Sequence, residues 1–258
     1  MSNSKRLYQQ IGLKLKDKIS AGEFKVGDKL PPEREIAESM EVSRSVIRES
    51  LIMLELQDIV KVKKGSGVFV INTPEQAQQL AAESLKPAEV VEQEQDDDAG
   101  PFEMLQARQF LESRIAEFAA SQVTKNDISR LREALDMERM HLEKNDLDYE
   151  GDEMFHIVIA EATQNSVLCD MVREMWVRRE KSAMWRQLHE RISNQDYRQR
   201  WLADHEKIYM ALVRKDPVAA REAMWQHLEN VKETLFELSD VDDPRFDGFL
   251  FSSYPVAS

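Results

Sequence analysis

The sequence predicts a mostly α-helical protein that consists of an N-terminal winged helix-turn-helix and a C-terminal antiparallel α-helical bundle. Residues 30–56 have the pattern of two short helices joined by a tight turn, and two β-branched runs, 59–63 and 68–71, follow them. From residue 102 to about residue 238, apolar residues recur at helical spacing and no strand pattern interrupts them. This second stretch predicts six or seven helices with short links.

The first three helices are marked by their caps and by apolar periodicity. A helix is expected over residues 7–21, where apolar residues recur at every fourth position until Gly22 ends the run. Pro31 and Pro32 suit the first turn of the next helix, because a missing amide donor costs nothing there. Ser43 can cap the third helix, since its hydroxyl can accept a hydrogen bond from a free backbone amide.

The start of the third helix carries polar residues that suit DNA recognition. Its apolar face consists of Val46, Ile47, Leu51 and Leu54, and the opposite face begins with Arg44, Ser45 and Arg48. A helix-turn-helix reads the major groove with the first residues of its second helix, where arginine can bind the O6/N7 edge of guanine. The glycine-containing turn at 64–67 would form a wing beside this helix. The alternative is an ordinary amphipathic helical hairpin without a DNA-binding role.

Three helices and a wing in this order resemble the winged-helix domain of GntR-type bacterial transcription regulators. The matching segments include the loop 27–31, the block 32–34, the run 43–49 and the wing 65–67. The resemblance implies DNA contacts by Arg34, Ser43, Arg44, Ser45, Val46 and Arg48, and wing contacts by Lys64, Gly65 and Ser66. Family members often carry a hydroxyl residue at the position of Val46, so this side chain is expected either to touch a thymine methyl group or to pack.

The charge of the chain is divided unevenly, which bears on its partners. The whole chain has a net charge of −13, but residues 1–72 hold 13 Lys and Arg against 10 Asp and Glu. Only this N-terminal part, at +3, has the sign that DNA phosphates attract. Such a small surplus predicts that the binding of double-stranded DNA depends on two copies of the domain, in a homodimer on a palindromic operator.

Composition also predicts the compartment and the division into domains. The single cysteine, Cys169, excludes an internal disulfide and fits a reducing compartment, and no apolar run approaches the length of a membrane span. We therefore expect a cytoplasmic protein with no membrane contact. The expected parts are a winged helix at 1–72, an acidic linker at 73–100, an all-α domain at 101–239 and a tail at 240–258. A single helix is expected over residues 166–187.

Four residues of the bundle are unusual for a plain apolar core. Asp152 and His156 are four residues apart and therefore project from one helix face, while His205 and His227 lie on the apolar stripes of two later helices. A carboxylate and three neutral imidazoles are good ligands for Zn²⁺, Ni²⁺ or a similar borderline ion. The alternatives are histidines that form hydrogen bonds in the core and an acid that favours the start of its helix.

The helical region resembles the FCD effector domain of the FadR-type branch of these regulators, in which the domain binds an effector and dimerises. Many members hold a divalent metal by an Asp-x-x-x-His pair and two later histidines. The matching residues here are Asp152, His156, His205 and His227. The resemblance also implies that Arg108 binds the effector, since a guanidinium can hold a carboxylate by two hydrogen bonds. Its alternative role is an ion pair with Glu112 within the bundle.

Further runs, such as 100–108 and 224–230, are similar to the hexuronate-utilisation repressors of enterobacteria. The resemblance implies that the effector is a hexuronate or its keto-sugar acid, and that its binding releases the protein from DNA. The sequence thus predicts a homodimeric, metal-containing transcriptional repressor, with zinc as the first candidate metal, and not an enzyme. Two alternatives stay open: a different carboxylate effector with a structural metal, and a metal-dependent enzyme fused to a DNA-binding head.

Overall fold

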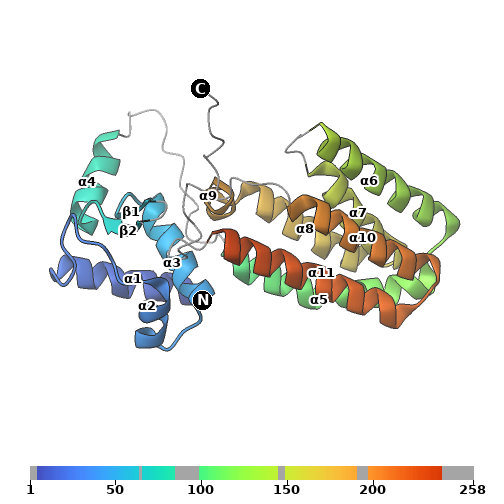
Figure 1. The fold of residues 1–258 in the computed structure, drawn as a ribbon, viewed down its shortest axis with the longest axis horizontal. Coiled ribbons are helices and arrows are strands. Elements are labelled where there is room, and N and C mark those ends of the chain that lie inside the picture. The colour runs from blue at the N-terminus through green and yellow to red at the C-terminus, as the bar shows by residue number, and fades with distance from the viewer. Residues whose placement is uncertain (1–4, 64–65, 85–98, 145–148, 191–196, 240–258) are drawn as a thin grey trace, which may run out of the picture. The chain divides into compact units, whose positions relative to one another are not determined.

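The computed structural model describes residues 5–63, 66–84, 99–144, 149–190 and 197–239 of the chain. Over these residues it contains 11 α-helices and one two-stranded sheet (Figure 1), so the predicted mostly α-helical fold is confirmed. The chain forms two compact units: the first contains Met1–Phe102, Ser182–Ser193 and Phe236–Ser258, and the second contains Glu103–Lys181 and Asn194–Leu235. None of the described helices is both long and apolar enough to span a membrane.

The first unit is built around a winged helix-turn-helix. Its elements are α1 (Leu7–Ser20), α2 (Glu33–Met40), α3 (Arg44–Leu56), β1 (Val60–Lys63), β2 (Gly67–Val70), α4 (Pro74–Ser84) and α9 (Ala183–Glu190). The two strands pair antiparallel with Val60 opposite Val70, as the predicted wing requires. Buried apolar residues of α1, α3 and both strands form one core, in which Ile47 and Leu51 are at most 1 % exposed.

The boundaries of these helices follow from their end residues. The Oγ of Ser43 accepts a hydrogen bond from the backbone N–H of Val46 at 3.4 Å, so Ser43 caps α3 as the sequence predicts. Helix α2 ends at Met40, and the next residue, Glu41, caps it in a left-handed conformation with φ of 56°. Helix α4 occupies the start of the predicted linker, and most of the remainder of that linker, residues 85–98, lies outside the described residues.

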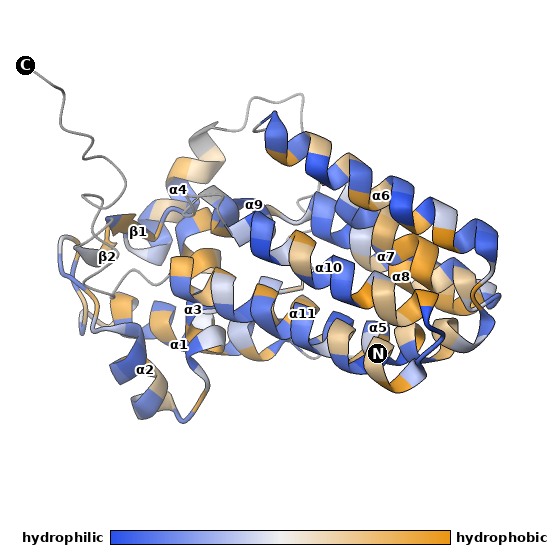
Figure 2. Ribbon diagram, turned by 45° about the vertical axis from the view of Figure 1, so that its right-hand side comes forward, coloured by the Kyte–Doolittle hydropathy of each residue, from blue (hydrophilic) through white to orange (hydrophobic). Residues whose placement is uncertain are grey.

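The second unit is a helical bundle. Its helices are α5 (Pro101–Gln122), α6 (Lys125–Glu143), α7 (Glu150–Ala162), α8 (Ser166–Lys181), α10 (Tyr197–Val213) and α11 (Pro217–Leu238). A capping motif starts α6, since the Oγ1 of Thr124 accepts a hydrogen bond from the backbone N–H of Asp127 at 3.3 Å. Helix α7 packs against both α6 and α8, and Figure 2 shows many hydrophobic residues along it. The inward side chains of α7 therefore lie deep in the bundle.

The expected single helix over residues 166–187 is wrong, because the structure divides this stretch into α8 and α9. Helix α8 ends at Lys181, Ser182 is not helical, and α9 begins at Ala183. The Oγ of Ser182 accepts a hydrogen bond from the backbone N–H of Trp185 at 3.0 Å, which is the geometry of a new helix start. Helix α9 packs against α3 within the first unit.

Candidate metal centre and DNA-binding surface

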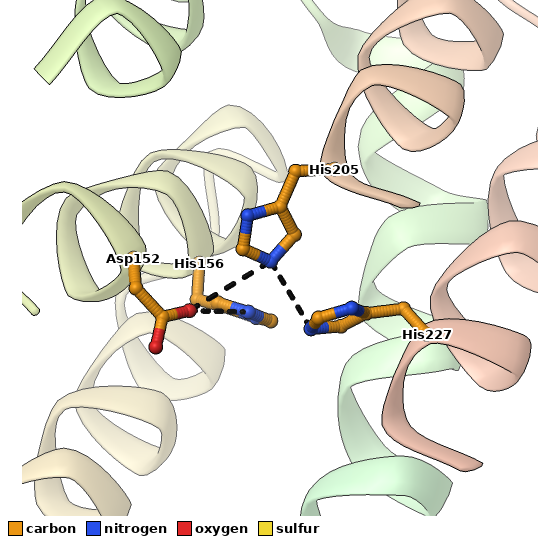
Figure 3. A group of neighbouring side chains, drawn as sticks. All are labelled: Asp152, His156, His205 and His227. Carbon is orange, nitrogen blue, oxygen red and sulfur yellow. Dashed lines mark hydrogen bonds and ion pairs between the residues drawn. The ribbon is translucent and has the colours of Figure 1, made fainter. Parts of the chain in front are cut away.

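The four residues predicted as metal ligands lie together inside the second unit (Figure 3). Asp152 and His156 project from α7, His205 from α10 and His227 from α11, and one potential ligand atom from each lies within 4.8 Å of all the others. The Nε2 atom of His205 is 3.0 Å from Nε2 of His227 and 3.7 Å from Oδ1 of Asp152. The same Oδ1 is 3.4 Å from Nε2 of His156.

Apolar packing fixes the direction of these side chains. The three histidines are at most 2 % exposed, and Phe155 of α7 stacks on the ring of His205 with the ring centres 4.6 Å apart. The four-residue spacing of Asp152 and His156 puts both on the inward face of α7. The cluster is therefore positioned by the same helix packing that forms the core of the bundle.

Two glutamates from neighbouring helices orient two of the histidines. Nδ1–H of His156 donates to the carboxylate of Glu112 on α5, and Nδ1–H of His205 donates to the carboxylate of Glu138 on α6 at 2.9 Å. A carboxylate on Nδ1 is the usual outer partner of a metal-binding histidine, because it fixes the ring and leaves Nε2 for the ion. Both histidines have this arrangement, with Nε2 turned toward the other potential ligands.

This role of the two glutamates was not predicted from the sequence. Glu112 was expected only as the alternative ion-pair partner of Arg108, and Glu138 was not singled out. A signal was present, because Glu138 continues the buried stripe of Leu131 and Leu135 at helical spacing. An acid on an otherwise apolar face has to find a partner inside the protein.

The donor set and its burial fit a divalent ion of the zinc type. Nε2 of His156, which faces the cluster, is buried and has no hydrogen-bond partner within the described part of the chain. Burial holds the pKa of His227 well below its ordinary value of 6.5, and the nearby His205 lowers it further, so this ring is neutral as a metal ligand must be. Metal–ligand bonds of about 2.0–2.2 Å separate neighbouring ligand atoms by roughly 3–4 Å, a range that contains the three distances given above.

Arg108 on α5 lies beside the cluster and forms the ion pair that the sequence left open as its alternative role. Its Nε donates to Oε1 of Glu112 at 2.7 Å, so Glu112 connects Arg108 to His156. The guanidinium of Arg108 also lies over the ring of Trp176, 4.6 Å from its centre. Nη2 of Arg108 is buried and has no hydrogen-bond partner among the described residues. The Nη2 amino group of this arginine is thus available for a ligand.

The residues predicted to contact DNA are placed in different ways. Arg34, Ser43 and Ser66 are exposed, and Arg44 and Ser45 are partly exposed at the start of α3. Val46 is also partly exposed and packs against the core of the first unit, which agrees with the packing role left open for it. Lys64 and Gly65 lie outside the described residues.

Arg48 differs from these residues because its side chain is fully buried. Its Nε donates to both carboxylate oxygens of Glu33 at 3.0 Å, its Nη1 donates to the backbone carbonyl of Phe236, and the ring of Phe236 lies 4.0 Å from the guanidinium. These contacts lie within the first unit. In the observed conformation Arg48 therefore supports α3 from behind, and a contact with a base would require these partners to be released.

The chain matches two described families and several curated proteins. Residues 7–70 match the family described as bacterial regulatory proteins, gntR family, and residues 103–230 match the FCD domain. The Uxu operon regulator of Haemophilus influenzae is 51% identical over 97% of this chain and 90% of that protein. The Uxu operon transcriptional regulator of Escherichia coli K12 is 46% identical over 99% of this chain and 96% of its own. The Exu regulon transcriptional regulator of the same strain is 46% identical over 99% and 95%.

Proposed function

This chain belongs to the gntR family of bacterial regulatory proteins and carries an FCD domain, and from this premise we propose that it controls genes of hexuronate use in response to a sugar acid. It is a transcriptional regulator and not an enzyme. The curated relatives named as regulators of the Uxu operon and the Exu regulon resemble it over nearly its whole length, which supports the proposed target genes.

On the DNA side, a homodimer reads a palindromic operator with the start of α3 and with the wing. The exposed or partly exposed residues proposed for this contact are Arg34, Ser43, Arg44, Ser45 and Ser66. Two heads are required because each carries only a small positive charge while the rest of the chain is acidic. Operator affinity should therefore depend on dimer formation and fall steeply with salt concentration.

In the second unit, the site binds a divalent ion, zinc first and nickel or another borderline ion as alternatives. The observation that carries this proposal is the convergence of one carboxylate and three imidazoles, with Glu112 and Glu138 orienting two of the rings. Bound there, the ion would supply a positive charge and open coordination positions for effector oxygens. The protein would hold it through Asp152 and the three histidines.

The arginines beside the cluster support an acidic effector. Arg108, Arg179 and Arg198 are buried or nearly buried near the cluster or its adjoining cavity. Together with a divalent ion they would provide positive charge that a carboxylate can pair with. The buried Nη2 of Arg108 can donate to such a carboxylate.

The effector would act by favouring the state that does not bind DNA. A ligand shifts such an equilibrium only through its different affinity for the two states. A small cavity adjoins the cluster at Asp152 and His205, but it has room for only about one water molecule. A six-carbon acid must therefore displace parts of the cavity wall, and this displacement is the proposed source of the different affinities.

The test is a titration of the metal-loaded dimer on its own upstream DNA with galacturonate, glucuronate and their keto isomers. Release of DNA by one of the acids, together with loss of that response in His205→Ala at an unchanged melting temperature, is the expected result. If His205→Ala unfolds but no acid releases the wild-type protein, the metal is structural and the hexuronate proposal is wrong.

A further inference from the structure

The cavity beside the metal cluster has a wall of its own, and Arg108 is not part of it. The wall consists of Glu138, Leu142, Tyr149, Asp152, Arg198, Trp201 and His205. Asp152 and His205 belong to the cluster, so a ligand in this cavity would reach the metal directly. Among the described residues that line this cavity, one carries a guanidinium, namely Arg198 in the first turn of α10.

From this arrangement we infer that Arg198 and Trp201 are the effector-binding residues of the cavity, where Arg198 binds the carboxylate of a small sugar acid and Trp201 donates to one of its hydroxyl oxygens. This inference rests on the proposed function and specifies its binding site. It gives Arg108 a different task, which is to position His156 through Glu112 and to add positive charge from outside the cavity wall.

The chemistry of the wall fits a ligand rich in oxygen. Arg198 is 8 % exposed, and its guanidinium lies over the ring of Tyr149 at 4.7 Å from the ring centre, an arrangement that holds it flat. A flat, fixed guanidinium can bind both oxygens of a carboxylate. Nε1 of Trp201 is buried, and no described residue accepts a hydrogen bond from it. An indole N–H only donates, so a ligand oxygen is the partner that would satisfy it.

The same wall explains how a cavity that is too small can admit the acid. Tyr149 directly precedes α7, Tyr197 begins α10, and their hydroxyl oxygens are 3.0 Å apart. Burial raises the pKa of Tyr197, so its phenol stays protonated and can donate this hydrogen bond. Opening the wall here would separate the two hydroxyl groups and would move Tyr149 away from the guanidinium of Arg198. Both are side-chain contacts at the starts of two helices.

The experiment measures binding of glucuronate and galacturonate by calorimetry to the zinc-loaded full-length protein, with glucose and galactose as probes that lack the carboxylate. Arg198→Gln is expected to weaken acid binding about 10- to 100-fold and to remove the preference for the acid over the neutral sugar. Trp201→Phe is expected to weaken both kinds of sugar by about three- to tenfold, because one neutral hydrogen bond is lost. Arg200→Gln, an exposed arginine on the same helix, is the matched control and should bind like the wild type.

Zinc affinity and melting temperature are measured for every variant, because a purely structural Arg198 would lower both without changing the preference between acid and neutral sugar. Arg198→Lys keeps the charge and should recover part of the preference, which a packing defect would not. If Arg198→Gln discriminates like the wild type, the inference is wrong and the proposed function stands. If the wild-type protein binds neither acid, the hexuronate proposal and this inference both fail.

Discussion

The substitution Glu138→Gln tests the metal centre with little disturbance of its surroundings. Glu138 lies 2.9 Å from Nδ1 of His205 and is 8 % exposed, and no other charged group is seen to pair with it among the described residues. Glu112 is less suitable, because it also neutralises the buried Arg108 and its loss would leave that cation without its partner. The amide of glutamine has nearly the size of the carboxylate, so the cavity wall should keep its shape.

The expected effect is a decrease of zinc affinity by a factor of about 10 to 100, which is the range for outer partners of metal-bound histidines. This corresponds to roughly 1.4–2.7 kcal/mol of binding free energy. The decrease is limited because the amide oxygen can still accept from Nδ1–H and orient the ring. What is lost is the negative charge, which makes the imidazole of His205 a stronger electron donor and offsets the charge of the ion.

The assay is a competition titration in which the metal-free protein and a chromophoric chelator share zinc at fixed pH. Glu133→Gln is the matched control, since Glu133 lies five residues earlier on the same helix and is exposed. His205→Ala, which removes a ligand, should lower the affinity further than Glu138→Gln. An unchanged dissociation constant in both Glu138→Gln and His205→Ala would refute the reasoning, because the ion would then be bound elsewhere.

Three other expectations concern the acid, the DNA and the core. Burial raises the pKa of Glu112, but the nearby Arg108 and His156 lower it more strongly, to about 2 against an ordinary 4.5. The ionised Glu112 therefore contributes about 3 kcal/mol to the free energy of unfolding. This contribution is present above pH 4.5 and is lost as the pH falls toward 2. Acid unfolding of the metal-free protein should therefore be less steep in Glu112→Gln than in the wild type. Arg44→Ala should weaken operator binding by about 1–3 kcal/mol, measured by fluorescence anisotropy at constant salt. An equal loss of affinity for unrelated DNA would show that Arg44 contacts only phosphate. Ile47→Ala should lower the free energy of unfolding, measured by urea titration, by about 2–5 kcal/mol, because Ile47 is fully buried. A loss below about 1 kcal/mol would contradict the tight packing of α3.

Much of the fold could be predicted because its signals are local. Ser43 and Thr124 are caps whose hydroxyl groups act within three residues, and the apolar periodicity gave the faces of the helices. The break at Ser182 was missed because the periodicity of the surrounding residues continues through it. The structure shows that a capping hydroxyl and packing of α9 against α3 decide this position. Packing between distant segments leaves little trace in the sequence near the break.

The candidate site was predictable in part for a similar reason. The spacing of Asp152 and His156 is a local property of one helix, whereas the approach of His205 and His227 depends on how three helices pack. Inward position on an apolar stripe indicated which histidines were candidates, and family resemblance indicated that they belong together. Arg198 carried no such signal, because it lies in the first turn of its helix and its partner Tyr149 is far away in the sequence.

Three buried glutamates lie beside functional candidates of this chain. Glu33, Glu112 and Glu138 are each at most 8 % exposed, and each pairs with a residue that the sequence analysis had singled out for function. This is expected physically, because a carboxylate can be buried only with a cation, a hydrogen-bond donor or a metal ligand beside it. An acid on an apolar helix face therefore predicts a polar partner in the core. For Glu33 that partner is Arg48, which accounts for the burial of an arginine that the pattern of α3 alone would place at the DNA.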